Sequence, residues 1–108
     1  MGSSLHARGQ TSGDIGENNS IHWEYNENTK TLTISGQGEM PDFINEHRLA
    51  MYTPWYTFKD DIIRVVVQEG ITATGRNAFE LSSNLVSVDL PKSLIAIGDG
   101  TFYKCHRL

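Results

Sequence analysis

The sequence has a single cysteine, Cys105, among its 108 residues, so no disulfide can form within the chain. No apolar run approaches the roughly 20 residues that a transmembrane helix requires. Basic residues are also few, with 9 Lys and Arg against 13 Asp and Glu, and they form no cluster. Nucleic acids and anionic membranes are held largely through phosphate charge, so the sequence disfavours both as partners. We therefore expect one small soluble domain with a net charge of −4.

Residues 1–20 have few large aliphatic side chains, only Leu5 and Ile15 after the initiator methionine. They lack the apolar core of about 7 to 15 residues that a signal peptide needs. Their composition of Gly, Ser, Asn and Thr cannot bury enough surface to offset the entropy lost on ordering. We therefore predict that residues 1–20 are a disordered leader or a cloning remnant outside the fold.

Two runs of alternating apolar and polar residues follow, over 21–26 and 31–35. This two-residue period is typical of half-buried strands, and the polar loop between the runs predicts a β-hairpin. The next segment, 40–53, is a longer connection with only a weak helical pattern through Ile44, Leu49 and Met51. Thr53-Pro54-Trp55 then has the hydroxyl and proline of a helix start, and we expect a short helix that ends near Asp60-Asp61. Residues 21–61 are therefore interpreted as an N-terminal hairpin cap with a short helix.

Residues 62–108 contain an internal repeat of 23 residues. When 62–85 is laid over 85–108, aliphatic, glycine and aromatic positions coincide, and a period of 23 lies in the range of about 20 to 29 residues found in leucine-rich repeats. The matching pairs are Val65 with Val88, Val67 with Leu90, Ile71 with Leu94, Ala73 with Ala96, Gly75 with Gly98, Phe79 with Phe102 and Leu85 with Leu108. We expect each unit to supply a short parallel strand, over 64–68 and 87–90, whose inward side chains are buried when the units stack.

The chain resembles the BspA-type leucine-rich repeat proteins over residues 21–108. The resemblance is carried by residues 31–43, Pro54-Trp55, 69–79 and 97–105. It implies an α/β fold: a short leucine-rich-repeat solenoid with parallel strands, capped at the N-terminus by a β-hairpin and a short helix. Such proteins are mostly secreted or on the bacterial cell surface, and some act in adhesion to host proteins or other cells.

One departure from the leucine-rich repeat pattern concerns its asparagine ladder. Gly70 and Ser93 stand where many such repeats have asparagine. The backbone groups of that turn must therefore find other hydrogen-bond partners.

The candidate ligand-binding residues are those that alternate with the core positions of the two repeat strands and so project from the sheet. They are Arg64, Val66, Gln68, Ser87 and Asp89. Two strands are only about 10 Å wide, so we expect this surface to bind a protein ligand weakly. The chain also stops at the first core position of a third repeat, Leu108, which predicts a fragment of a longer protein or self-association through the uncovered end.

Signals for catalysis, metals and cofactors are weak, and we assign none of these sites. Cys105 and His106 are chain neighbours that point apart, and the histidines lack metal-ligand spacing. The aromatic residues of the cap offer an alternative, a carbohydrate-binding module, in which Tyr56 is the best exposed candidate. The leading hypothesis is a non-enzymatic, extracellular or cell-surface adhesion module that binds a protein ligand, for example a host or extracellular-matrix protein.

Overall fold

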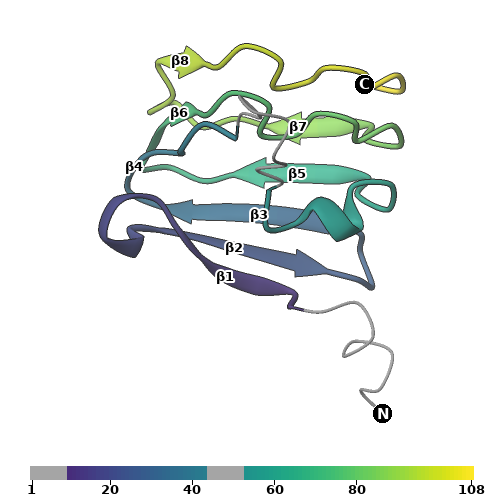
Figure 1. Cartoon of the computed structure of the whole chain (residues 1–108), viewed down its shortest axis with the longest axis horizontal. Helices are drawn as coiled ribbons and strands as arrows, with labels where there is room; N and C mark the ends of the chain where they lie inside the picture. Colours follow the sequence, from purple (N-terminus) through teal and green to yellow (C-terminus); the bar gives the residue numbers. More distant parts are fainter. Residues whose placement is uncertain (1–9, 44–52) are drawn as a thin grey trace.

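The computed structural model describes residues 10–43 and 53–108. Strands dominate these ranges, and the helical elements are single turns of 3-10 helix (Figure 1). The elements in chain order are β1 (Ser12–Ile15), η1 (Glu17–Asn19), β2 (Ile21–Asn26), β3 (Thr31–Gly36), β4 (Gly38–Glu39), η2 (Tyr56–Phe58), β5 (Arg64–Val67), β6 (Ile71–Thr74), β7 (Ser87–Asp89) and β8 (Ala96–Ile97). The expected α/β class is therefore corrected to a mainly β fold in the described residues. The weak helical pattern through Ile44, Leu49 and Met51 lies outside them.

The large sheet has the strand order β1-β2-β3-β5-β7. The predicted hairpin is confirmed, since β2 and β3 pair antiparallel from Ile21 opposite Gly36 to Asn26 opposite Thr31. β1 adds a further antiparallel strand, in which Ser12 lies opposite Glu24. The prediction that all of 1–20 lies outside the fold is wrong for β1, because β1 pairs its backbone with the edge of the hairpin and Ile15 packs against the core.

The repeats enter the large sheet as parallel strands beside the hairpin. β3 pairs with β5, and β5 pairs with β7, so that Leu32, Val65 and Val88 lie in one row. The row sets Val65 opposite Val88, which confirms the 23-residue offset. The phenylalanine rings of Phe79 and Phe102 stack with centroids 6.0 Å apart, as the same offset requires. Parallel pairing covers only part of the large sheet, because β1, β2 and β3 pair antiparallel.

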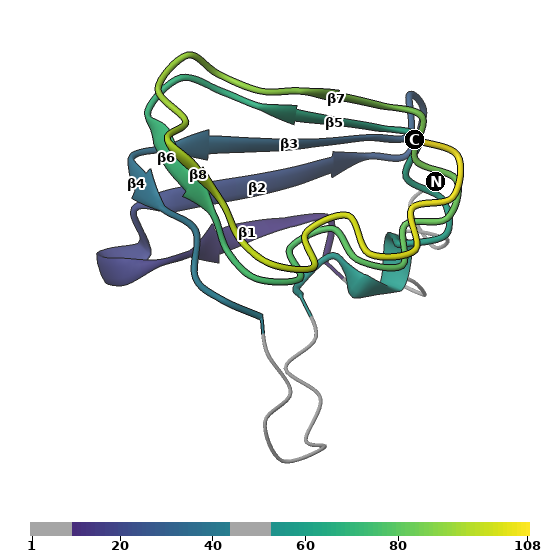
Figure 2. The same cartoon turned by 90° about the horizontal axis from the view of Figure 1, so that it is seen from above.

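A small parallel sheet, β4-β6-β8, was not predicted. β6 sets Ala73 beside Ala96 of β8, and it sets Ile71 beside Gly38 of β4. Seen from above, the chain of each repeat runs along the large sheet, turns a corner into the small sheet and returns through an irregular segment (Figure 2). The core therefore lies inside a three-sided outline.

Aromatic side chains of the cap fill the core beneath the hairpin. Trp23 and Trp55 are 2% and 1% exposed and meet edge to face at 5.9 Å. Tyr25 stacks on the fully buried Phe58 with ring centroids 4.4 Å apart. The predicted short helix is a single 3-10 turn, Tyr56–Phe58. It is short because Phe58 and Ile62 must both be buried in the core before β5 begins at Arg64.

The turn that lacks the asparagine ladder has the substitute partners that its backbone requires. Ser93 Oγ accepts a hydrogen bond from Gly70 N at 3.0 Å and donates one to Ile71 O at 2.8 Å. The Glu69 carboxylate accepts from Lys92 N at 2.7 Å and from Ser93 N at 3.3 Å. The Glu69 side chain of the first repeat thus hydrogen-bonds to the backbone of the second, and the Ser93 side chain of the second hydrogen-bonds to the backbone of the first.

Burial is less complete in the second repeat than in the first. Val88 and Phe102 pack against the core, but Leu90 is 43% exposed, so the expectation that Leu90 is buried is wrong. The cause is its place directly after β7, the last strand of the large sheet, where no described residue covers the outer edge. Ile95 and Ile97 are exposed at the same edge of the small sheet. Self-association through this edge stays a prediction.

Candidate functional site: the outer face of the large sheet

The outer face of the large sheet carries the residues predicted to bind a ligand. In β5 and β7 the inward side chains are Val65, Val67 and Val88, and the alternate positions point away from the core. Four of the five predicted residues are exposed and Val66 is half-buried. The structure therefore brings Arg64, Val66, Gln68, Ser87 and Asp89 onto one face, with Gln68 just beyond the end of β5. Their role in binding stays a prediction.

This face is wider than the two strands that the sequence indicated. Because β3 pairs with β5 in parallel register, Thr33 lies beside Val66, which lies beside Asp89. On the other side of β3, Glu24 of β2 lies opposite Thr33. Five strands with four spacings of about 4.8 Å give a face about 19 Å wide. The outward residues of the hairpin that the prediction omitted are His22, Glu24, Asn26, Thr31, Thr33 and Ser35.

Two pairs of polar or charged side chains lie toward the two margins of this face. Arg64 of β5 forms an ion pair with Asp89 of β7, and both side chains are about half exposed. On the opposite margin, His22 Nδ1 lies 2.9 Å from Asp14 Oδ1. Exposed pairs of this kind contribute about 0 to 1 kcal/mol, so a ligand can open them at small cost. Between these two pairs, the hydroxyl groups of β3 and the Val66 side chain carry no charge, and Glu24 of β2 adds an exposed carboxylate beside Thr33.

The thiol of Cys105 is engaged within the fold. Its Sγ donates a hydrogen bond to the carbonyl oxygen of Phe79 at 3.1 Å. Burial raises the pKa of the Cys105 thiol, and a backbone hydrogen bond with Ser82 opposes that rise in part. A raised pKa lowers the thiolate fraction at neutral pH, and the thiolate is the nucleophile. This environment is that of an inert structural cysteine.

We expect iodoacetamide to modify Cys105 at least about tenfold more slowly than it modifies glutathione at pH 7.5. The rate should climb as the pH rises through 9, because the neutral thiol persists to a higher pH than in a free cysteine. Mass spectrometry of timed, quenched reactions measures both rates. Modification as fast as that of glutathione at pH 7.5 would contradict the assignment and revive a nucleophilic role for Cys105.

The aromatic residues of the cap that the structure describes do not form an exposed stacking surface. Trp23, Tyr25 and Trp55 are all less than 5% exposed. Tyr56, the candidate for carbohydrate contact, is half-buried, and Lys59 Nζ lies 4.6 Å from its ring centroid. Burial thus assigns Trp23, Tyr25 and Trp55 to the core, and among the described aromatic residues of the cap Tyr56 is the one that still fits the carbohydrate alternative.

Metal-ligating side chains do not gather anywhere in residues 10–43 and 53–108, where no group of three or more His, Cys, Asp or Glu has the arrangement that a metal ion requires. No helix in the same ranges has the length and apolar character needed to cross a bilayer.

The fold is similar to that of bacterial leucine-rich repeat proteins. A leucine-rich repeat protein from Eubacterium ventriosum is 32% identical, with a TM-score of 0.71 over 88% of this chain and 24% of that protein. The leucine-rich repeat protein TpLRR of T. pallidum has the same kind of fold, with 16% identity and a TM-score of 0.51 over 87% of this chain and 47% of that protein. The chain thus spans about a quarter and about half of these proteins. No protein-family model and no curated protein sequence matches it.

Proposed function

We propose that this chain is a non-enzymatic protein-interaction module and that its ligand binds the outer face of the large sheet. The observation that carries this proposal is the continuous face of five strands, with the hydroxyl groups of β3 and the Val66 side chain near its centre, the Arg64–Asp89 ion pair toward β7 and the His22–Asp14 contact toward β1. A flat polar face with a few half-buried side chains is suited to a protein surface rather than to a small molecule, which needs a concave site. The similarity to leucine-rich repeat proteins supports the same class of function.

We further propose that the chain is the capped N-terminal part of a BspA-type leucine-rich-repeat solenoid. The resemblance in sequence over residues 21–108 supports the BspA type, and the matching register of the two repeats supports the solenoid. In such an arrangement each further repeat would add one parallel strand to each sheet. The ligand face would then extend from the hairpin along the stack.

The same resemblance supports an extracellular or cell-surface location and a role in adhesion. The proposed ligand is accordingly an extracellular protein, for example a host or extracellular-matrix protein. Because the sheet face is broad and nearly flat, its affinity depends on area more than on a single pocket.

Val66→Arg tests the proposed face, because Val66 lies near its centre and is half-buried rather than buried. We expect the variant to fold normally and to reduce binding to immobilised extracellular-matrix proteins at least about tenfold, as measured by surface plasmon resonance. Arg64→Glu should weaken the same binding, because it replaces the ion pair with Asp89 by repulsion. Arg76→Glu, an equally large charge change at an exposed residue outside this face, is the matched control. Equal binding by Val66→Arg and the wild type would exclude the proposed face.

A further inference from the structure

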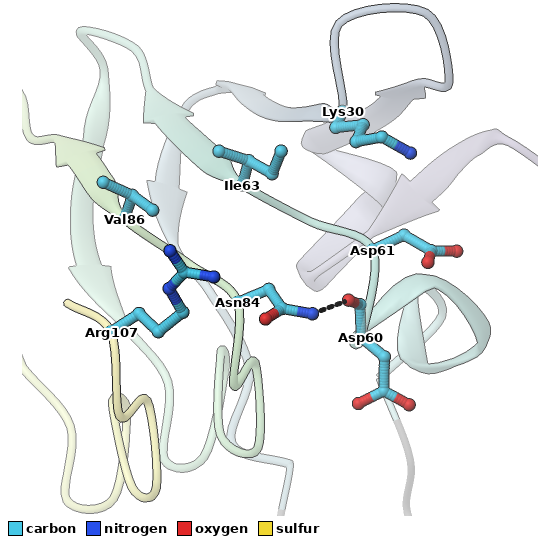
Figure 3. Close-up of a pocket in the computed structure, with 7 residues that line it drawn as sticks. All are labelled: Lys30, Asp60, Asp61, Ile63, Asn84, Val86 and Arg107. Carbon is cyan, nitrogen blue, oxygen red and sulfur yellow. Dashed lines mark hydrogen bonds between the residues drawn. The ribbon is translucent and has the colours of Figure 1, made fainter.

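A groove at the corner where the chain enters β5 and β7 is not part of the outer face. Its volume is about 330 Å³, and it is open to solvent. Figure 3 shows two aliphatic side chains, Ile63 and Val86, between Arg107 on one side and Lys30 with Asp61 on the other. Ile63 and Val86 are 40% and 50% exposed although each directly precedes a strand of the large sheet. We call this feature the corner groove.

The repeat itself builds the corner groove. Lys30 O accepts hydrogen bonds from the N–H groups of residues 63 and 64, and Ile63 O accepts them from residues 86 and 87 in the same way. Lys30, Ile63 and Val86 are therefore equivalent positions in three successive levels of the stack. A second column, Asp61, Asn84 and Arg107, recurs at intervals of 23 residues and forms the adjacent wall.

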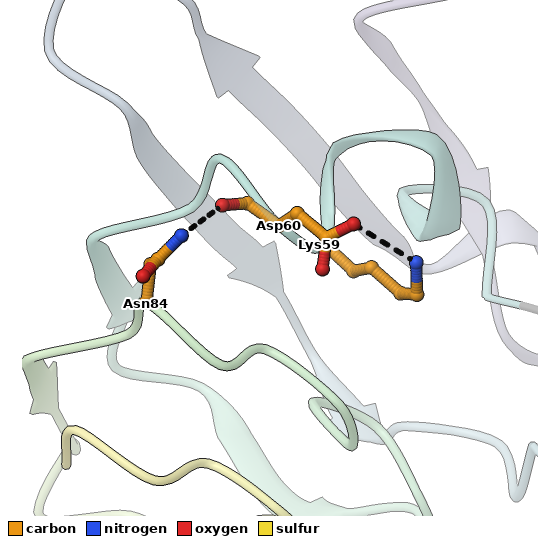
Figure 4. A network of polar contacts seen from close by, with 3 residues as sticks. All are labelled: Lys59, Asp60 and Asn84. Carbon is orange, nitrogen blue, oxygen red and sulfur yellow. Dashed lines mark hydrogen bonds and ion pairs between the residues drawn. The ribbon is translucent and has the colours of Figure 1, made fainter.

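Hydrogen bonds hold the wall of the corner groove in place. Asn84 Nδ2 donates to the backbone carbonyl oxygen of Asp60 at 2.7 Å, which ties the segment before β7 to the segment before β5 (Figure 4). The Asp60 carboxylate lies 3.2 Å from Lys59 Nζ. By contrast, neither Lys30 nor Arg107 has a carboxylate within 4.0 Å among the described residues. Two cationic side chains without a carboxylate within 4.0 Å in the described ranges thus lie at the two ends of an apolar floor.

We propose that the corner groove binds an acidic, extended segment of the protein ligand. Its two carboxylates would meet Lys30 and Arg107, and an apolar side chain between them would cover Ile63 and Val86. This inference rests on the proposed function, because it assumes that the ligand is a protein, and it adds a second contact beside the outer face.

The spacing of the corner groove fits such a segment. Lys30 and Arg107 are three levels apart in the stack, which at about 4.8 Å per level is about 14 Å. In an extended peptide, residues i, i+2 and i+4 point to one side and span about 13.6 Å. A segment with acidic residues at i and i+4 and an apolar residue at i+2 therefore directs all three side chains into the corner groove. Carboxylates bound to guanidinium or ammonium groups form the stronger, charge-assisted class of hydrogen bond.

The probe for this site is the blocked pentapeptide acetyl-Glu-Ser-Leu-Ser-Glu-amide. In an NMR titration of the ¹⁵N-labelled chain, we expect it to shift the amide signals of Ile63, Asn84 and Val86. Two matched peptides should bind at least about fivefold more weakly: acetyl-Lys-Ser-Leu-Ser-Lys-amide, which reverses the charges, and acetyl-Glu-Ser-Ser-Ser-Glu-amide, which removes the apolar side chain. Absence of groove shifts with the first peptide, or equal binding of all three, would overturn the proposal.

The matched variants are Arg107→Glu and Arg76→Glu, which change the net charge equally. Arg107→Glu should raise the dissociation constant of acetyl-Glu-Ser-Leu-Ser-Glu-amide at least about tenfold and tighten binding of the lysine peptide. Arg76→Glu should change neither by more than about twofold, and equal effects of the two variants would reduce the result to long-range charge and overturn the site. Val66→Arg should leave peptide binding intact. If the peptide does not bind but Val66→Arg still abolishes protein binding, only the corner groove proposal is excluded. If the peptide binds in the corner groove but Val66→Arg leaves protein binding unchanged, only the proposed outer face is excluded.

Discussion

We expect Gly75→Ala to lower the free energy of unfolding by about 3 kcal/mol or more, at the upper end of the cost of overpacking. A Cβ atom on Gly75 would lie 1.6 Å from the carbonyl oxygen of Pro41 and 2.9 Å from the backbone nitrogen of Asp42. Both contacts are with backbone, so no side-chain rotation can relieve them. The nearby backbone of Arg76 is also fixed, since its N–H donates to the Asp42 carboxylate at 2.8 Å.

Two other glycines provide graded comparisons for Gly75→Ala in urea denaturation followed by circular dichroism. At Gly98, the equivalent position in the second repeat, a Cβ atom would lie 2.7 Å from Arg76 N, so Gly98→Ala should cost less than Gly75→Ala. At Gly38 no heavy atom lies within 4 Å of the added Cβ atom, and its φ of +102° leaves only backbone strain of about 1 to 2 kcal/mol. An order in which Gly38→Ala is the most damaging would refute the close approach of the cap to the first repeat.

The sequence predicted those parts of the fold that depend on local pattern or on exact repetition. Alternation over residues 21–26 and 31–35 identified the hairpin, because one face of each strand is buried against the aromatic core. The 23-residue offset identified the register of β5 and β7, because equivalent residues of stacked repeats occupy equivalent places. Both signals lie in the kinds of residues and their spacing, and neither needs knowledge of distant contacts.

The parts that were missed depend on pairing between segments with little pattern of their own. β4 and β8 are two residues long, too short to show a period, and β6 has the sequence Ile-Thr-Ala-Thr with no exposed polar alternation. The sequence contained one signal for the small sheet, the coincidence of Ala73 with Ala96 at the 23-residue offset, because these two residues pair between β6 and β8. β1 contains Gly13 and two polar residues, so only its register with β2 reveals it as a strand.

The width of the candidate surface was underestimated because it, too, depends on pairing between distant segments. Its repeat residues followed from alternation, but the hairpin residues belong to it only because β3 and β5 are parallel neighbours. Nothing in the spacing of residues 31–35 and 64–67 indicates that pairing, because the two strands are separated by the whole of 37–63. The helix start at Thr53-Pro54 was likewise a valid local signal, and the burial of Trp55 and Phe58 limited it to one turn.

The largest cavity-forming substitution is expected at Trp55, which joins the cap to the first repeat. Its ring is 1% exposed and lies 5.9 Å from that of Trp23, 5.5 Å from that of Phe43 and 6.0 Å from that of Phe79. Its Nε1 donates a hydrogen bond to Ala78 O at 3.0 Å. We expect Trp55→Ala to lower the free energy of unfolding by about 3 to 5 kcal/mol, a large part of the 5 to 15 kcal/mol typical of a domain.

Two variants separate the contributions of the Trp55 ring and its hydrogen bond. Trp55→Phe keeps an aromatic ring but removes the donor to Ala78 O, so it should cost about 1 to 3 kcal/mol, less than Trp55→Ala. Tyr103→Ala, at a ring that is 55% exposed, should cost less than about 0.5 kcal/mol. Because Trp55 contacts residues of both the cap and the first repeat, calorimetry of Trp55→Phe should show one transition at a lower temperature. Two separate transitions, with the repeats melting at the wild-type temperature, would mean that the cap does not stabilise the repeats through this ring.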